Sequence, residues 1–246
     1  MKITSLLSKT MLVVVCGLIW ATALPAQNTW FDIGLNFAYG PTFQLNKNIG
    51  DSRSYEHQFT MGKSYGAKIG VNFGQFSGLH VVYNLAEGKQ DYELIDVLQQ
   101  DQTLNYTWNT HDIMLLYRYS GYGAYVEFGP KYSIIRDVTQ TIGGAGTTDV
   151  TVGFTDYTSA VLGFGSYIAG SDVVTLNLGI RLAYSFTDMI SEEGMALRLP
   201  ETTLVEGFSQ YESTNPISAM LNVELSYAFG RIAKRSCQDR KKLILF

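Results

Sequence analysis

Apolar and polar residues alternate along much of the chain. In the first such segment Phe31, Ile33 and Leu35 alternate with Asp32 and Gly34. Alternation with a period of two places one set of side chains on each face of an extended chain, so it predicts β-strands whose two faces meet different environments. This pattern predicts eight strands, at residues 31–39, 65–73, 79–85, 112–119, 125–134, 160–165, 174–186 and 217–229.

The connections between these segments alternate in length. Three are short, at residues 74–78, 120–123 and 169–172. The other four are long and polar, at residues 43–60, 87–105, 136–152 and 188–215. Short turns at one end and long loops at the other are typical of up-and-down antiparallel barrels in bacterial outer membranes. An even number of strands also returns both termini to the short-turn end.

Alternation alone also fits a secreted soluble barrel, in which the apolar side chains surround a ligand cavity. The composition of the polar face favours a membrane-spanning barrel instead. This face is rich in Gly, Ala, Ser and Asn, which suit the narrow interior of an eight-stranded barrel. Its charges balance, and we expect them to pair in the lumen because an unpaired buried charge is costly. These residues are Asp32, Lys68, Asp112, Arg118, Glu127, Lys131, Arg181 and Glu224.

Aromatic residues lie near both ends of the apolar stripes, as expected for the two interfaces of a lipid bilayer. The predicted girdles are Phe31, Phe73, Tyr119 and Phe229 at the short-turn end, and Tyr39, Tyr65, Tyr132 and Tyr184 toward the long loops. We therefore predict an all-β fold, an eight-stranded up-and-down antiparallel transmembrane β-barrel. The last strand should pair with the first, because hydrocarbon offers backbone polar groups no other partner.

The two terminal segments differ from the barrel. Lys2 and Lys9 make the first residues of the chain basic, and an apolar run follows at 11–21. Small residues then precede a cleavage site after Ala23 or Ala26. This pattern predicts a secretory signal peptide at 1–26, with cleavage after Ala26 preferred. The barrel domain then covers 27–230. Residues 231–246 form a basic tail that we expect in the periplasm, like both ends of the barrel.

Composition narrows the function classes. Of the 246 residues 46% are hydrophobic and 13% aromatic, which excludes a disordered chain. The formal net charge of −4 argues against a nucleic-acid binder. The acidic residues of 87–105 and 188–215 do not have the spacing of a calcium loop. We therefore expect no metal, no cofactor and no nucleic-acid partner.

Catalysis and conduction are both disfavoured by the pattern. The three histidines are scattered, and neighbours such as His111 and Asp112 point to opposite faces of a strand. An eight-stranded interior is also just filled by side chains, so the lumen charges indicate a salt-bridged plug. We expect no enzyme and no catalytic residues. A lipid-modifying enzyme that uses His80 and His111 stays open as an alternative, as does the soluble ligand-binding barrel.

Two segments resemble a known family. They are Thr110-His-Asp-Ile-Met-Leu-Leu-Tyr-Arg-Tyr119 and Tyr125-Val-Glu-Phe-Gly-Pro-Lys-Tyr132, joined by a short glycine-containing turn. With the signal and the eight strands, they make the chain similar to the small outer-membrane β-barrel proteins of Bacteroidota, often called PorT-like. The resemblance implies an integral outer-membrane protein of the cell envelope with a structural or interaction role, of which an accessory role in type IX protein secretion is one form. The implied partners are outer-membrane lipid and an envelope protein that contacts the external loops or the basic tail.

Overall fold

The computed structural model describes residues 29–52, 54–73, 76–95, 101–143, 146–171, 173–200 and 210–229. The predicted signal peptide at 1–26 and the predicted tail at 231–246 lie outside these ranges. Eight long strands dominate the described chain: β1 (Thr29–Asn46), β3 (Thr60–Phe73), β4 (Ser77–Ile95), β5 (Asp101–Gly121), β6 (Ala124–Ile142), β8 (Tyr157–Gly170), β9 (Val174–Ser185) and β10 (Thr214–Phe229).

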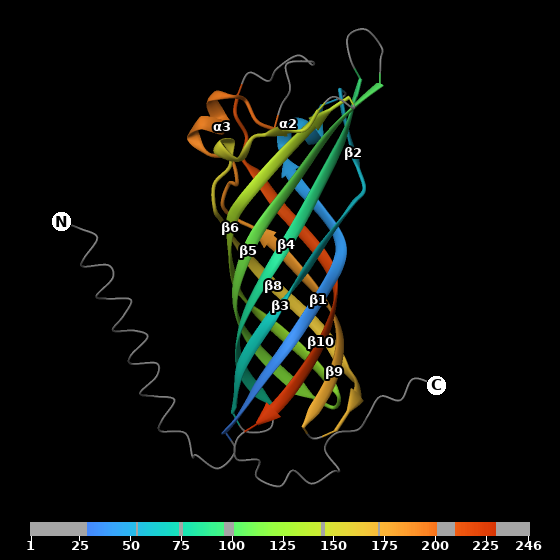
Figure 1. Cartoon of the computed structure of the whole chain (residues 1–246), viewed down its shortest axis with the longest axis vertical. Coiled ribbons are helices and arrows are strands. Elements are labelled where there is room, and N and C mark those ends of the chain that lie inside the picture. Colours follow the sequence, from blue (N-terminus) through green and yellow to red (C-terminus); the bar gives the residue numbers. More distant parts are fainter. Residues whose placement is uncertain are drawn as a thin grey trace, which may run out of the picture.

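These strands close into a ring. Each pairs antiparallel with its neighbours in the order β1, β3, β4, β5, β6, β8, β9, β10, and β10 returns to β1. The closing register runs from Phe31 opposite Phe229 to Asn46 opposite Thr214. Closure gives the backbone N–H and C=O groups of every long strand partners on both sides. The prediction of an eight-stranded up-and-down barrel is confirmed (Figure 1).

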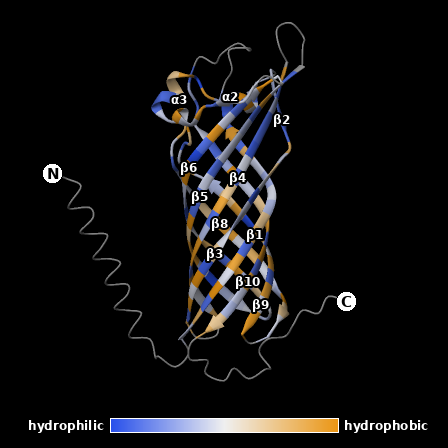
Figure 2. Cartoon of the chain, in the orientation of Figure 1, coloured by the Kyte–Doolittle hydropathy of each residue, from blue (hydrophilic) through white to orange (hydrophobic). Residues whose placement is uncertain are grey.

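In the half of the barrel that ends in the short turns, apolar side chains face outward and polar side chains face inward, as in a membrane-spanning barrel. Side chains such as Leu35, Ile69 and Leu225 are exposed on the outer wall, whereas polar residues such as Asn36 and Glu224 are buried inside. Figure 2 shows hydrophobic and hydrophilic residues alternating along these strands. A soluble barrel would place the apolar residues inside, so this wall is a lipid-facing surface.

The predicted aromatic girdles lie on this outer wall. Seven of the eight side chains are well exposed, and that of Phe73 is partly buried. Phe31 and Phe229 stack across the β1–β10 closure with ring centroids 5.8 Å apart. At the same end Phe76 packs beside Tyr119 at 5.9 Å. The end with the short turns therefore carries a band of aromatic rings where the wall meets the membrane interface.

The long loops are shorter than the sequence suggested. Ile95 pairs with Asp101, so most of 87–105 is a strand hairpin, and β6 likewise continues to Ile142. The reason is that the alternation continues but its polarity reverses. On β4 the outward positions above Leu85 are charged, while the inward positions Tyr92 and Leu94 are fully buried. The strands thus leave the membrane and continue as an ordinary water-exposed sheet.

A small folded cap covers this end of the barrel. It contains α2 (Lys47–Asp51), β2 (Tyr55–Gln58), β7 (Thr148–Asp149), the 3-10 helix η2 (Thr151–Gly153) and α3 (Glu192–Ala196). Strand β2 pairs with β4, and β7 pairs with β6. The side chains of Asn46 and Ser191 cap α2 and α3 by accepting backbone N–H groups of the first turn. No helix in the described ranges is long and apolar enough to span a membrane.

The cap has its own hydrophobic core, which the sequence analysis did not identify. Its buried members come from α2, β2, β4, β5, β6 and β8 and from the segments beside η2 and α3, which meet above the lumen. They are Ile49, Tyr55, Tyr92, Leu94, Leu104, Tyr106, Trp108, Val138, Phe154, Tyr157, Met189, Ile190 and Leu199. This core closes the upper mouth of the barrel with packed apolar and aromatic side chains.

Two leucines test the assignment of the lipid-facing wall. Leu35 lies midway along the apolar stripe of β1 and is 65% exposed, and Leu197 in the cap is 66% exposed. Leu35→Arg should destabilise the membrane-inserted barrel by about 2–4 kcal/mol, because it places a charge in hydrocarbon. Leu197→Arg should change it by less than about 0.5 kcal/mol. Urea unfolding from lipid vesicles measures both, and equal effects would contradict the assignment.

Candidate functional site

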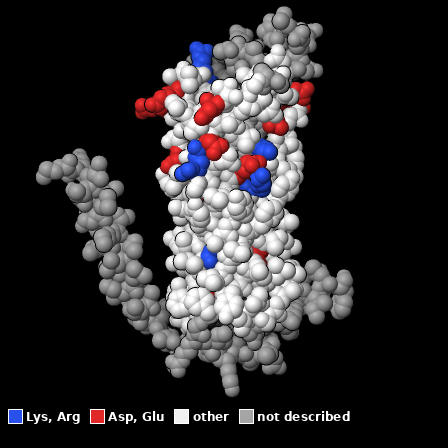
Figure 3. Space-filling model, in the orientation of Figure 1, with Lys and Arg blue, Asp and Glu red and all other residues white. Residues whose placement is uncertain are grey.

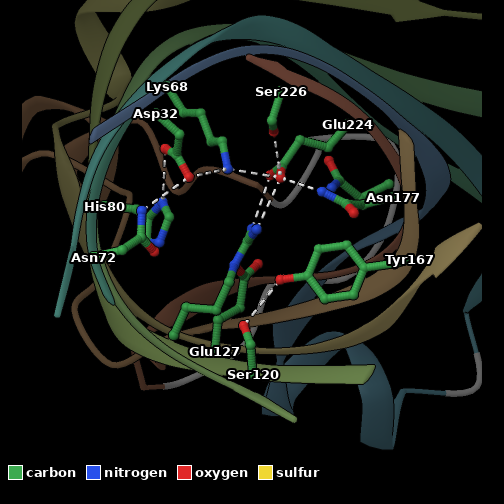
Figure 4. Close-up of polar contacts among 12 residues, drawn as sticks. Asp32, Lys68, Asn72, His80, Ser120, Glu127, Tyr167, Asn177, Glu224 and Ser226 are labelled. Atoms are coloured by element: carbon green, nitrogen blue, oxygen red, sulfur yellow. Dashed lines mark hydrogen bonds and ion pairs between the residues drawn. The ribbon is translucent and has the colours of Figure 1, made fainter. Parts of the chain in front are cut away.

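The candidate site is the ionic network in the lumen. All eight predicted lumen charges are buried, with side chains from six of the eight barrel strands, and none is more than 9% exposed. Six of them form one connected network, and Asp112 and Lys131 form a separate pair nearer the cap. Figure 4 shows the lower part of the network, viewed within the ring of strands.

Glu224 on β10 is the most highly coordinated carboxylate. It accepts hydrogen bonds from Lys68 Nζ at 2.8 Å and from both terminal nitrogens of Arg118 at 2.8 Å each. Asn177 Nδ2 donates to it at 2.9 Å and the Ser226 hydroxyl at 3.1 Å. A fully buried carboxylate with this many donors is stable as an ion, because the charge-assisted hydrogen bonds offset its desolvation.

Arg118 joins this centre to a second buried carboxylate. Its Nε and Nη2 donate to Glu127 Oε2 at 3.0 and 2.7 Å, while its other contacts go to Glu224. The guanidinium also lies over the ring of Tyr125, with Cζ 4.2 Å from the centroid. Arg181 Nε donates to the other oxygen of Glu127 at 2.5 Å. Arg118 therefore holds two carboxylates from β6 and β10, two strands that β8 and β9 separate in the ring.

The network extends toward the short-turn end through Asp32. Lys68 Nζ lies 3.5 Å from Asp32 Oδ2, to which Asn72 Nδ2 donates at 3.2 Å. His80 Nδ1 lies 3.6 Å from the other oxygen of Asp32. Asn72, His80, Asn177 and Ser226 are thus members of the site that the sequence analysis did not assign. The period-two pattern places these four residues on the inward face, but the sequence analysis singled out only the charged residues of that face.

Small residues make room for these side chains. A Cβ atom on Gly163 would lie 2.7 Å from Cγ of Glu127, and one on Gly70 would lie 2.4 Å from Asp32 Oδ1. Both distances are too short for a side chain to be added without displacing the carboxylate. Each of these two glycines is the cross-strand partner of the carboxylate that it accommodates.

The remaining pair of lumen charges, Asp112 and Lys131, lies closer to the cap. Lys131 Nζ is 3.3 Å from Asp112 Oδ2, and Thr110 Oγ1 donates to the other carboxylate oxygen at 2.8 Å. The ammonium group also lies 5.7 Å from the ring centroid of Tyr157, a member of the cap core. This pair links the lumen to the cap.

Little open space is left in the lumen. A cavity of about 60 Å³ lies on the cap side and is lined by Ala38, Asn84, Met114 and Met220 among others. A second of about 20 Å³ lies beside His80. One water needs roughly 10–15 Å³, so these spaces fit a few waters and no hydrated solute. The ionic network closes the lumen within the barrel, and the cap core closes its upper mouth.

The three histidines lie far apart in the described structure. His80 is in the lumen, whereas His111 faces outward and shares a hydrogen bond with the Tyr83 hydroxyl. His57 lies in the cap with its ring centroid 5.1 Å from that of Tyr92, and burial lowers the pKa of its imidazole. Within the described ranges, no group of three or more His, Cys, Asp or Glu side chains could hold a metal ion.

Comparison with known proteins gives likenesses of fold. No protein-family model matches the sequence, and neither does any curated protein. Among solved structures, Neisserial surface protein A aligns over 79% of this chain and 96% of its own at 11% identity, with a TM-score of 0.38. OprG from Pseudomonas aeruginosa aligns over 83% and 98% at 12% identity, with a TM-score of 0.39. AlkL in lipid bilayers aligns over 87% and 96% at 13% identity, with a TM-score of 0.37.

OprG and AlkL are outer membrane proteins by their descriptions, and the Neisserial protein is described as a surface protein. The assignment of this chain as a transmembrane barrel of the outer-membrane type rests on its own closure and its outward apolar wall.

Removing Arg118 tests the energetic role of the network. Arg118→Met leaves Glu127 with one cationic partner and takes the bidentate partner from Glu224, so it should cost about 3–5 kcal/mol of unfolding free energy. Lys89→Met is the matched control, because Lys89 pairs with Glu87 at 3.1 Å on the surface and its side chain is 44% exposed. Its loss should cost at most about 1 kcal/mol. Similar costs for both variants, measured by denaturant unfolding, would mean that the lumen network does not stabilise the barrel.

Proposed function

We propose that this protein is an integral outer-membrane barrel that conducts no solute and acts through its cap, which it presents outside the cell. The observation that carries the proposal is the double closure of the lumen by the Arg118 network and the cap core. A barrel closed in this way has its accessible chemistry on its outer surfaces. A structural or protein-interaction role fits this arrangement.

The cap provides a surface suited to such a role. Val152 on η2 and Leu197 beside α3 are 73% and 66% exposed, and η2 and α3 are in contact. Glu192 and Glu193 lie in the first turn of α3. Exposed apolar residues with charged neighbours are a common feature of protein-binding surfaces. An accessory role in protein secretion, implied by the resemblance to PorT-like proteins, is a specific form of this proposal.

Orientation is part of the proposal. Phe31 and Phe229 lie at the end with the short turns, and outer-membrane barrels have short turns on the periplasmic side. The cap is then extracellular, and the two ends of the described chain are periplasmic.

Thiol labelling of intact cells tests the location and the orientation together. In a Cys237→Ser background, Leu197→Cys in the cap should react with a membrane-impermeant maleimide. Tyr122→Cys, in the short β5–β6 turn and 90% exposed, should react only after the outer membrane is permeabilised. The reverse labelling pattern would contradict the orientation, and labelling of both positions in a soluble fraction would contradict the membrane location.

Conductance of the purified protein in planar bilayers tests the closed lumen. The wild-type barrel should show no steady ion current, because the two closures leave room only for isolated waters. A stable open channel in the wild-type protein would overturn the proposal of a non-conducting barrel.

A further inference from the structure

A recess in the outer wall lies where the apolar surface gives way to charged residues. It has a volume of about 360 Å³ and is formed by the outward faces of β3, β4, β5 and β6. Lys63, Glu87, Asn109, Arg136 and Asp137 supply its polar lining. Figure 3 shows acidic and basic residues gathered on the upper part of this face, above a zone with few charges.

Strand register places the recess across the membrane boundary. Lys63, Glu87, Asn109 and Asp137 are successive partners in a row that crosses the four strands. The next row toward the short-turn end consists of Tyr65, Leu85, His111 and Ile134. A molecule in the recess would therefore contact charged groups above and apolar or aromatic groups below.

A β-bulge brings an additional cation to this row. Asn109 pairs with Asp137 and Thr110 with Ile135, so Arg136 is left without a partner in the ladder. As a result Arg136 and Asp137 are both exposed, although they are neighbours in one strand. Bulges commonly re-aim a side chain at a functional position, and here the bulge adds a guanidinium to the lining of the recess.

The charges of the recess leave one cation unpaired. Lys63 and Lys89 both lie 3.1 Å from Glu87, and Asn109 Nδ2 donates to Asp137 at 2.7 Å. Arg136 makes no ion pair with any residue of the described ranges. Both carboxylates thus have partners, and the guanidinium is available for an anion. Arg binds phosphate with two parallel hydrogen bonds, a geometry that Lys does not offer.

We propose that this recess binds the phosphate headgroup of a membrane lipid. Arg136 and Lys63 contact the phosphate, and the acyl chains lie along the apolar row of Tyr65 and Leu85. The apolar lower border distinguishes this site from one for a free anion, because a soluble phosphate would leave that border exposed to water. The inference rests on the proposed membrane placement, in which this row lies at the headgroup level of one leaflet.

Lipid retention by the full-length protein tests the proposal. The protein is purified in detergent micelles doped with phosphatidic acid or with diacylglycerol of the same acyl chains, and retained lipid is counted by native mass spectrometry. The wild type should retain phosphatidic acid in preference to diacylglycerol. Arg136→Gln should lower that retention about tenfold, the loss expected for a charge-assisted contact. Lys63→Gln should lower it as well.

Lys47→Gln is the matched control, because Lys47 is an exposed cation at the start of α2 in the cap. It should leave retention unchanged. Equal retention of diacylglycerol would reduce the recess to an apolar contact and overturn the proposal. So would unchanged retention in Arg136→Gln, or binding of inorganic phosphate with the affinity and Arg136 dependence seen for the lipid.

The folding and the placement of the variants are checked separately. Each variant should keep the thermal unfolding profile of the wild type in micelles, so that a loss of lipid is not a loss of fold. Thiol labelling of the cap in cells reports orientation without reference to lipid retention. Failure of lipid binding with normal labelling would reject the headgroup site alone, whereas reversed labelling with normal lipid binding would reject the orientation alone.

Discussion

The interior of this barrel depends on the ion pairs that Arg118 makes with two buried carboxylates. A narrow lumen filled with ionised side chains is stable only if every charge has a partner, because each desolvated ion costs several kcal/mol. Arg118 meets this requirement for two carboxylates at once, Glu127 and Glu224, which reach it from β6 and β10. Lys68 and Arg181 neutralise the remaining charge. The paired lumen in turn leaves the apolar side chains on the outer wall, where lipid solvates them.

The same strands serve two environments. On β4, β5 and β6 the outward residues below the row of Leu85 and His111 are apolar, and the lumen behind them holds the buried charges. Above that row the outward residues of these three strands are polar, and their inward residues join the cap core. On β5 the change separates the inward Trp108 of the cap core from the inward Asp112 and Arg118 of the lumen. The β4–β5 ladder continues through the change without interruption, since period-two geometry does not depend on which face is wet, and β6 passes through it with one bulge at Arg136. This continuity is what joins a membrane barrel to a water-soluble cap without a linker.

The sequence predicted the barrel well because each lipid-spanning strand carries its own period-two signal. It also predicted which eight charges face inward, since parity alone decides that. It could not predict the partners: Arg118 and Glu224 are 106 positions apart, and only the closed ring brings them together. The long connections were predicted to be loops because their outward residues, such as Lys89 and Asp91, are polar, as loop residues usually are. The bulge at Arg136 was also invisible, because one extra residue in a strand has no hydropathy signature.

Site-directed spin labelling along β4 tests the central claim that a sealed barrel changes polarity at the membrane surface. Labels at 79, 81, 83 and 85 should collide with oxygen dissolved in lipid, and labels at 87, 89, 91 and 93 with a water-soluble nickel relaxant. Inward labels at 82 and 84 should be reached by neither. Access of the nickel relaxant to the inward positions would show an open, water-filled lumen, and oxygen access above position 87 would remove the proposed boundary; either result would contradict this account.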